Sequence, residues 1–225
     1  MASSTKNSIS VSIIGGSGYT GAELMRIVSR HPHFKLVQVV ANRNAGKKIQ
    51  DIFPHLRHLN LPDFISFEKM IFEDLDLIFC ALPHATSQKI IVKIPEEIKI
   101  IDLSADFRLE RVEEYERWYG QKHIAPSLQE KSVYGLTEIY KKKIEKGSLI
   151  ACTGCNSAAT LYPVLPLLNE GIINEDNLII NLGAGVSGAG RDAKQNLIHA
   201  EVSEGVKPYN IGKHRHIAEL EQEFK

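Results

Sequence analysis

One cysteine in the second half of the sequence has the surroundings expected of a nucleophile. Cys155 follows Gly154, which allows a sharp turn, and a helical pattern over 155–168 begins with it. A thiol at a helix N-terminus has its thiolate stabilised and its pKa lowered, and a thiolate attacks acyl groups. Backbone N–H groups at such a turn are suited to hold an oxyanion. We therefore predict a covalent acyl intermediate on Cys155.

Other interpretations of this cysteine have less support. Cys152 and Cys155 form a C-x-x-C pair, but there is no second pair to complete a metal site, so no metal is predicted. Dithiol exchange is typical of thioredoxin-like chains, which lack a dinucleotide loop of the kind described below, and Cys152 is interpreted as a strand end. A buried, inert thiol remains the alternative. With Cys80 the chain has three cysteines, an odd count that argues against a disulfide framework.

A base for this thiol is expected in the basic segment 212–219, which reads GKHRHIAE. On a strand, His214 and His216 would point to opposite sides, so we expect only one of them to reach the site. Lys213 or Arg215 is suited to bind a substrate anion. The alternative is a solvated basic turn.

A glycine-rich loop near the N-terminus predicts a dinucleotide site. Residues 15–21 read GGSGYTG and lie between a strand pattern and a helix pattern. Glycine permits a tight turn and a close approach of the backbone to a pyrophosphate, and the helix N-terminus offers N–H groups to the anion. The alternative is a structural turn with Thr20 and Glu23 as a capping box. The predicted cofactor-binding residues are Gly15, Ser17, Gly18, Tyr19, Thr20 and Gly21.

The end of the second strand indicates which dinucleotide binds. Folds specific for NAD usually carry Asp or Glu there, to bind the ribose 2′-hydroxyl. Residues 41–44 read ANRN, with no acid, and supply Arg43 instead. An arginine can hold a 2′-phosphate through charge-assisted hydrogen bonds. We therefore predict NADP(H), with a solvated surface arginine as the alternative.

Strands and helices alternate along the chain. Strand patterns cover 9–14, 34–41, 76–81, 98–103, 149–152 and 178–182, and helical patterns cover 22–28, 84–94, 109–118, 155–168 and 217–224. This alternation predicts an α/β fold with a doubly wound, Rossmann-type NADP-binding domain over 1–150. A partial α/β substrate domain, which serves catalysis and dimerisation, is predicted over 151–225. Because the chain stops inside the last helical pattern, we expect a C-terminally truncated protein.

Composition excludes several classes of partner. Lys plus Arg number 27 and Asp plus Glu also number 27, so neither nucleic acid nor a polybasic membrane surface is predicted. Apolar runs such as 77–82 are far shorter than the roughly 20 residues of a spanning helix. Residues 1–10 lack the apolar stretch of a signal peptide. A cytosolic protein is expected.

Taken together, these segments resemble the N-acetyl-gamma-glutamyl-phosphate reductases of arginine biosynthesis, within the semialdehyde dehydrogenase superfamily. The matching strings spread over most of the chain, and their combination is specific. They are GGSGYTGAEL at 15–24, ALPH at 81–84, IDLSADFRL at 101–109, YGL at 134–136, GVSGAGR at 185–191 and HRH at 214–216.

The resemblance implies NADPH-dependent reduction of a γ-acyl phosphate to a semialdehyde, with release of inorganic phosphate. It implies a nucleophile at Cys155, a general acid/base at His214 that Glu219 orients, and Ser187 and Gly188 near the cofactor. It also implies a homo-oligomer, a dimer or tetramer. The substrate phosphate or carboxylate is expected to meet one or more of three arginines, which can bind either group bidentately: Arg108, Arg191 and Arg215.

Two departures from the family pattern keep rival functions open. The family has Pro-Gly-Cys followed by Tyr or Phe, Pro and Thr, whereas residues 153–158 read TGCNSA. That string is closer to relatives that reduce carrier-protein-bound aminoadipyl or glutamyl phosphate. The chain is also shorter than family members. Further rivals are aspartate-semialdehyde dehydrogenase, against which the SADFR and HRH strings argue, and a non-catalytic NADP-binding module.

Overall fold

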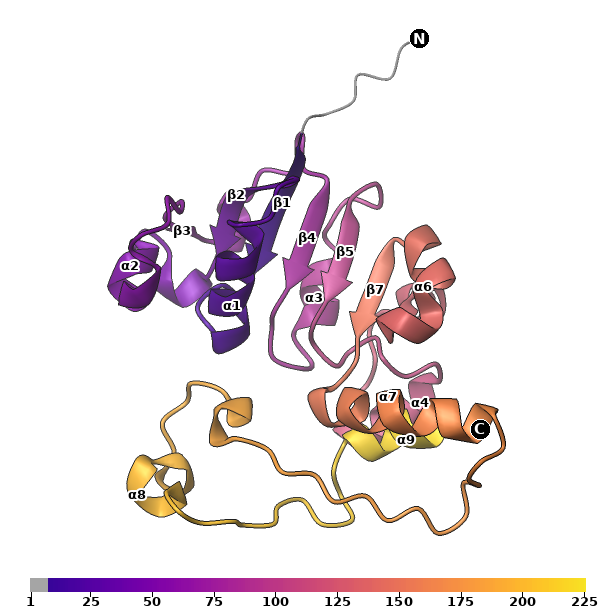
Figure 1. Cartoon of the computed structure of the whole chain (residues 1–225). Helices are drawn as coiled ribbons and strands as arrows, with labels where there is room; N and C mark the ends of the chain where they lie inside the picture. Colours follow the sequence, from indigo (N-terminus) through magenta and orange to yellow (C-terminus); the bar gives the residue numbers. More distant parts are fainter. Residues whose placement is uncertain (1–7) are drawn as a thin grey trace.

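The computed structural model describes residues 8–225 and contains one parallel sheet (Figure 1). Its seven strands run in the order β3-β2-β1-β4-β5-β7-β6, and every neighbouring pair is parallel. The first half of this order, with β1 at the centre, is that of a Rossmann-type sheet. The strands are β1 (Ile9–Ile14), β2 (Phe34–Val40), β3 (Phe64–Ile65), β4 (Leu77–Cys80), β5 (Lys99–Asp102), β6 (Val133–Gly135) and β7 (Leu149–Cys152).

Both faces of the sheet are buried. Neighbouring residues of a strand point to opposite faces, and both sets of side chains lie in apolar cores. Ile13 and Val39 belong to a core that includes Met25 of helix α1 (Tyr19–Val28). The next residue of β1, Ile14, belongs to a second core that includes Ile91 of helix α3 (Ser87–Ile91). Apolar strands covered on both sides are typical of parallel sheets, and the predicted doubly wound fold is confirmed.

Shorter elements connect the strands. They are α2 (Ile49–Ile52), α4 (Val112–Tyr119), α5 (Pro126–Lys131) and α6 (Thr137–Lys146). The helix expected over 84–94 is shorter, because residues 84–86 form a turn in which Ala85 has φ +62°. The capping box considered for α1 does not form: its N-cap is Gly18, and Glu23 pairs with Arg26 at 2.7 Å.

Beyond the sheet, helices α7 (Cys155–Asn169) and α9 (His216–Glu223) lie against each other below the carboxyl ends of the strands, close to α4 (Figure 1). Leu161 of α7 and Leu220 of α9 share one apolar cluster. Ala218 of α9 packs with Tyr115 and Tyr119 of α4 in another. The C-terminal helix therefore packs against residues from both halves of the chain.

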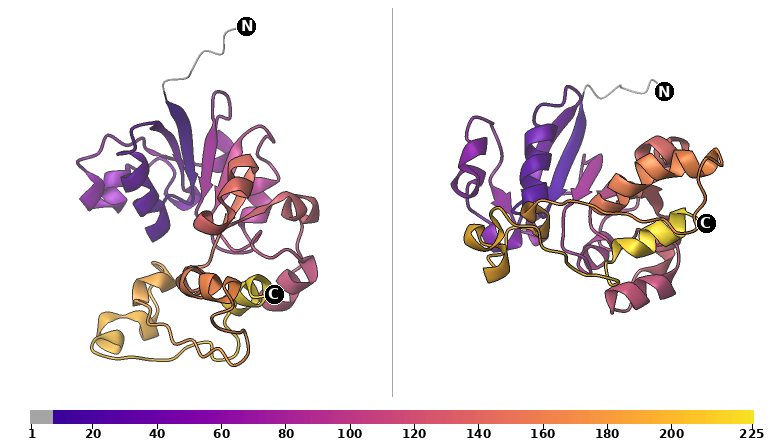
Figure 2. Two further views of the ribbon diagram at one scale, coloured as in Figure 1. Left: turned by 45° about the vertical axis from the view of Figure 1, so that its right-hand side comes forward. Right: turned by 60° about the horizontal axis from the view of Figure 1, so that its bottom comes forward.

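Residues 170–215 form a long excursion between these two helices, with the short helix α8 (His199–Val202) at its far end (Figures 1 and 2). The prediction of a strand over 178–182 is wrong, because these residues pair with no other strand among the described residues. A strand needs a neighbour to satisfy its backbone N–H and C=O groups, and no described residue supplies one here. Accordingly Ile179 is 88% exposed.

Among the described residues, no helix is both long and apolar enough to cross a membrane. The expectation that no signal peptide is present rests largely on residues 1–7, which lie outside the described residues.

Candidate active site

The loop after β1 has the geometry that the glycine pattern predicts. Gly15 has φ +86°, and a Cβ there would lie 2.7 Å from the carbonyl carbon of Ala81, so only glycine fits against the end of β4. The N–H groups of Gly15 and Gly16 both donate to the carbonyl of Val40, at 2.9 and 3.0 Å. These bonds tie the loop to the end of β2, and the contact of Gly15 with Ala81 places it over the end of β4, so it borders the crevice between β1 and β4 where nucleotides bind in such sheets.

The N-terminus of α1 presents an uncapped row of N–H groups. No side chain caps the helix, and its first turn carries no acid that would repel an anion. A Cβ at Gly18 would meet only the carbonyl oxygen of Gly15, at 3.8 Å, so the space above the turn is open. Tyr19 and Thr20 are exposed beside it, and Ser17 is half-buried. The loop is thus shaped to hold a diphosphate.

Two arginines are candidates for contacts with the dinucleotide. Arg43 is exposed in the 3₁₀ turn Asn42–Asn44, directly after β2. Arg191 comes from the excursion: its Nη1 donates to the carbonyl of Ser17 at 2.9 Å, and its guanidinium lies 4.8 Å from the ring of Phe53. Ser187 and Gly188, in the turn Val186–Ala189, are exposed a few residues before it. Arg191, expected at the substrate, thus contacts the dinucleotide loop.

Cys155 is the first residue of α7, as the sequence predicts, and the structure shows that it is exposed. Its Sγ lies 3.9 Å from Oδ1 of Asn156. The other two thiols differ from it: Cys80 is fully buried, and burial raises the pKa of Cys152 to about 11. Cys155 is thus the accessible thiol of the three, placed where helix N–H groups stabilise negative charge.

Both histidines of the 212–219 segment lie next to residues that flank this thiol, contrary to the expectation that only one would reach the site. They occupy a turn and a helix start rather than a strand, and their ring centroids are 4.7 Å apart. Nε2 of His214 lies 3.4 Å from Nδ2 of Asn156 and 3.3 Å from the hydroxyl of Tyr209. A Cβ on Gly154 would lie 2.6 Å from the His216 ring, so His216 touches the residue that precedes the nucleophile.

Glu219 is fully buried on α9 and faces His216, not His214. Its Oε1 lies 4.0 Å from Nε2 of His216, while its Oε2 accepts hydrogen bonds from the Tyr134 hydroxyl at 2.7 Å and the Gly154 N–H at 2.9 Å. Burial lowers the pKa of His216 to about 4, and the carboxylate opposes this effect. The predicted pairing of Glu219 with His214 is therefore corrected to a pairing with His216.

Arg108, expected to bind a substrate anion, is 8% exposed and donates within the protein through all three nitrogens. Nε donates to the Cys152 carbonyl at 2.6 Å, Nη2 to the Leu103 carbonyl at 3.0 Å, and Nη1 to Glu219 at 3.3 Å. Arg108 therefore belongs to the scaffold of the site. Arg215 is half-buried; it donates to His84 and lies 5.0 Å above the Tyr119 ring.

The SADF part of the SADFR string is a buried polar network rather than a binding surface. Asp106 accepts hydrogen bonds from the N–H groups of Ala85 and Gln88, which ties the turn after β4 to the turn after β5. Ser104 donates to Asp102 through its N–H at 2.9 Å and its hydroxyl at 2.7 Å. Burial raises the pKa of Asp102 to about 6. The network fixes the loop that carries Arg108.

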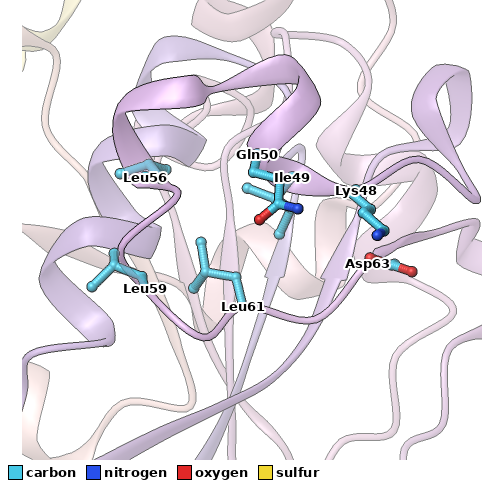
Figure 3. Close-up of a pocket in the computed structure, with 7 residues that line it drawn as sticks. All are labelled: Lys48, Ile49, Gln50, Leu56, Leu59, Leu61 and Asp63. Carbon is cyan, nitrogen blue, oxygen red and sulfur yellow. The ribbon is translucent and has the colours of Figure 1, made fainter.

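A cavity of about 190 Å³ lies away from this site, beside α2 (Figure 3). None of the predicted site residues lines it. Its lining residues are Lys48, Ile49, Gln50, Leu56, Leu59, Leu61 and Asp63.

No pattern in the sequence points to a role for Tyr134 or Asn156. The only signal for them in the sequence is that Tyr134 lies in the matching string YGL and Asn156 in the departing string TGCNSA. Their partners are distant in sequence; Glu219, for example, follows Tyr134 by 85 residues.

Comparisons with known proteins agree with this geometry. Residues 10–147 match the family described as "Semialdehyde dehydrogenase, NAD binding domain", and residues 155–225 match "Semialdehyde dehydrogenase, dimerisation domain". Among curated proteins, the chain is 51% identical to an N-acetyl-gamma-glutamyl-phosphate reductase of Rhodobacter capsulatus, over 95% of this chain and 63% of that protein. It is 49% identical to the protein of the same name from Ruegeria pomeroyi, with the same coverage.

The chain thus spans about two thirds, 63%, of the length of these curated relatives. Among solved structures, aspartate semialdehyde dehydrogenase II of Vibrio cholerae superposes with a TM-score of 0.52 at 14% identity, over 72% of this chain and 43% or 47% of the two chains compared. That likeness shows a common fold. With one family model covering the sheet and a second beginning at Cys155, the chain belongs to the semialdehyde dehydrogenase family.

Proposed function

We propose that the protein reduces N-acetyl-gamma-glutamyl phosphate to N-acetylglutamate semialdehyde and inorganic phosphate, with NADPH as the reductant. The observation that carries this proposal is the exposed Cys155 at the start of α7, with an imidazole against each of its neighbours, Gly154 and Asn156, below the sheet that carries the glycine loop. The name shared by relatives of about 50% identity supports the choice of acyl phosphate. Residues 151–225, which include the match to a dimerisation domain, are proposed as the catalytic and dimerisation domain, and this supports a homo-oligomer.

The glycine loop fits a dinucleotide. The open space at Gly18 and the uncapped N–H groups of α1 would hold its diphosphate. Arg43 would hold the 2′-phosphate of NADP, since no acid occupies that position to favour NAD. When bound, NADPH supplies the hydride that converts an enzyme thioester to a thiohemiacetal. Ser187 and Gly188 are proposed near it, as the Arg191–Ser17 contact brings their segment to the loop.

The chain's own residues carry out the rest of the reaction. The Cys155 thiolate attacks the acyl carbon; the carbon–sulfur bond forms, the carbon–oxygen bond to phosphate breaks, and inorganic phosphate leaves. N–H groups at the start of α7 hold the oxyanion. After reduction, the carbon–sulfur bond breaks and the sulfur keeps the electron pair. A histidine accepts the proton from the hydroxyl whose oxygen becomes the aldehyde carbonyl. Arg215, half-buried next to the histidines, is the best placed of the three arginines to bind a substrate anion.

Two histidines are candidates for the acid and base, and their surroundings favour the predicted His214. His214 contacts Asn156, the neighbour of the nucleophile. His216 has the Glu219 carboxylate 4.0 Å from its Nε2, its Nδ1 is buried without a hydrogen-bond partner among the described residues, and burial lowers its pKa to about 4. An imidazole with both nitrogens turned into the protein and so low a pKa is a poor proton carrier at neutral pH, so His214→Asn should lower kcat more than His216→Asn. The reverse order would make His216 the base.

The direct test is Cys155→Ser, assayed by phosphate-dependent NADP reduction with the semialdehyde. We expect a loss of at least about 10³-fold, as when a member of a catalytic triad is removed. Activity near that of the parent protein would refute the covalent mechanism. Running the assay in the reductive direction with free and carrier-linked acyl phosphates tests the choice of substrate, because the residues after Cys155 resemble those of relatives that act on the carrier-linked form. A cytosolic location and the absence of nucleic-acid and membrane partners stay predictions from the sequence.

A further inference from the structure

The turn that carries the nucleophile is held by a single ion pair. Nε of Arg108 donates to the Cys152 carbonyl at 2.6 Å, and Nη1 of the same side chain lies 3.3 Å from Oε1 of Glu219. The other oxygen of Glu219 accepts the N–H of Gly154 at 2.9 Å. The two peptide groups on either side of Thr153 are thus bound by the two partners of one pair. These contacts form a ring from Cys152 through Arg108 and Glu219 to Gly154, the residue before Cys155.

Tyr134 is the third member of this arrangement. Its hydroxyl donates to Oε2 of Glu219 at 2.7 Å, from strand β6, which pairs with the strand that ends at Cys152. Burial and the charge of Glu219 raise the pKa of Tyr134, so this hydroxyl stays protonated and donates at every physiological pH. Tyr134 and Arg108 approach the carboxylate from different segments, and together with Gly154 they limit its position.

The same carboxylate lies beside His216. Oε1, the oxygen bound by Arg108, is also the one that lies 4.0 Å from Nε2 of His216. His216 in turn lies against Gly154, where a Cβ would be only 2.6 Å from its ring. A shift of the carboxylate would therefore move both the peptide N–H before Cys155 and the imidazole beside it.

We propose that Arg108 and Tyr134 are positioning residues that act through Glu219: they hold its carboxylate, which fixes the Gly154 peptide and the His216 ring around Cys155. Neither residue touches the substrate. This inference rests on the proposed function, because it assumes that Cys155 is the reacting group. It also gives the arginine of the SADFR string a role other than anion binding.

A contribution to folding alone is the simplest competing explanation, because removing one member of a buried ion pair is strongly destabilising. The informative variant is therefore Tyr134→Phe, which removes a single hydroxyl and keeps the ring. Tyr140→Phe is its matched control: Tyr140 donates to Glu223 at the same distance, 2.7 Å, but its hydroxyl does not contact Glu219. Arg108→Lys is a third variant that keeps the charge and loses the planar fork.

The first measurement is the rate at which iodoacetamide alkylates Cys155 between pH 6 and 9, with the modified residue assigned by peptide mass spectrometry. It needs neither substrate nor cofactor. We expect Tyr134→Phe to slow alkylation at pH 7 by about three- to tenfold, the size expected when one ordinary hydrogen bond is lost, and to shift the pH profile upward. Arg108→Lys should slow it further, and Tyr140→Phe should leave it unchanged.

The second measurement is steady-state kinetics: Tyr134→Phe should lower kcat about tenfold while the KM for NADPH stays within about twofold. Equal alkylation rates and pH profiles in the parent and in folded Tyr134→Phe would overturn the positioning role. A parent Cys155 that reacts no faster than free cysteine would instead refute the proposed function, so the two failures are distinguishable. An equal effect of Tyr140→Phe would also overturn the proposal, since it would show a general loss of packing.

Discussion

Adding one methyl group at Gly154 is the sharpest perturbation that this structure offers. Gly154 has φ −65° and ψ 147°, an extended conformation that alanine adopts freely, so Gly154→Ala introduces no backbone strain. The new Cβ would lie 2.6 Å from Cδ2 of His216 and 2.7 Å from Oε1 of Glu219. The effect would therefore be purely steric.

The size of the effect follows from these distances. Carbon atoms in ordinary contact are about 3.5–4.0 Å apart, so the imidazole and the turn must separate by about 1 Å. Glu219 is fully buried and bound by three partners, so it cannot move away at low cost. Overpacking of this kind costs about 1–3 kcal/mol of unfolding free energy. A displacement of about 1 Å between catalytic groups lowers a rate about 10²-fold.

Urea unfolding and steady-state kinetics measure the two effects separately. The control is Gly205→Ala, because a Cβ at Gly205 would meet its nearest atom at 3.7 Å, an ordinary contact. We expect its unfolding free energy and kcat to match the parent. If Gly154→Ala keeps kcat within twofold and unfolds at the same urea concentration, His216 and Glu219 are not where this structure places them, and the argument for the site fails.

Two further predictions concern the sheet and the cofactor loop. Burial raises the pKa of Asp102 from 3.8 to about 6, so the folded state binds the proton more tightly than the unfolded state. Protonation of Asp102 therefore contributes to stability fully below pH 3.8, and this contribution is lost as pH rises through 6. The unfolding free energy of Asp102→Asn, relative to the parent, should therefore rise by about 2–3 kcal/mol between pH 4 and pH 7, and a flat difference in urea titrations would contradict the assignment. Arg43→Ala should raise the KM for NADPH about tenfold and leave that for NADH unchanged, because it removes a charged hydrogen bond to the 2′-phosphate alone; equal changes for both cofactors would place Arg43 outside that contact.

Local patterns predicted the parts of the site that depend on neighbouring residues. The turn at Gly15 and the start of α7 at Cys155 are set by a few consecutive residues, so their geometry could be read from the sequence. The helix at 84–94 was predicted too long because its first turn is held by a distant side chain, Asp106, through the N–H of Ala85. Such a bond leaves no periodic signal in the sequence.

The roles of Arg108 and Glu219 could not be predicted for the same reason. Both residue types are usually exposed, and their burial depends on a contact across 111 residues. The histidine pair was misjudged because the segment was treated as a strand, whereas it forms a turn that begins α9. The apolar run at 178–182 has a strand's composition but no partner among the described residues, and pairing is what makes a strand.

The distance between Arg108 and Glu219 along the chain has a consequence for synthesis on the ribosome. Every strand of the sheet precedes Gly154, so the sheet can assemble on the nascent chain before α9 exists. At about 5–20 residues per second, Glu219 is translated some 6–22 s after Arg108, and during that interval the guanidinium has no carboxylate. The nucleophile's turn thus takes its final form only after α9 emerges and docks, so the setting of the thiol is completed later than the sheet that supports it.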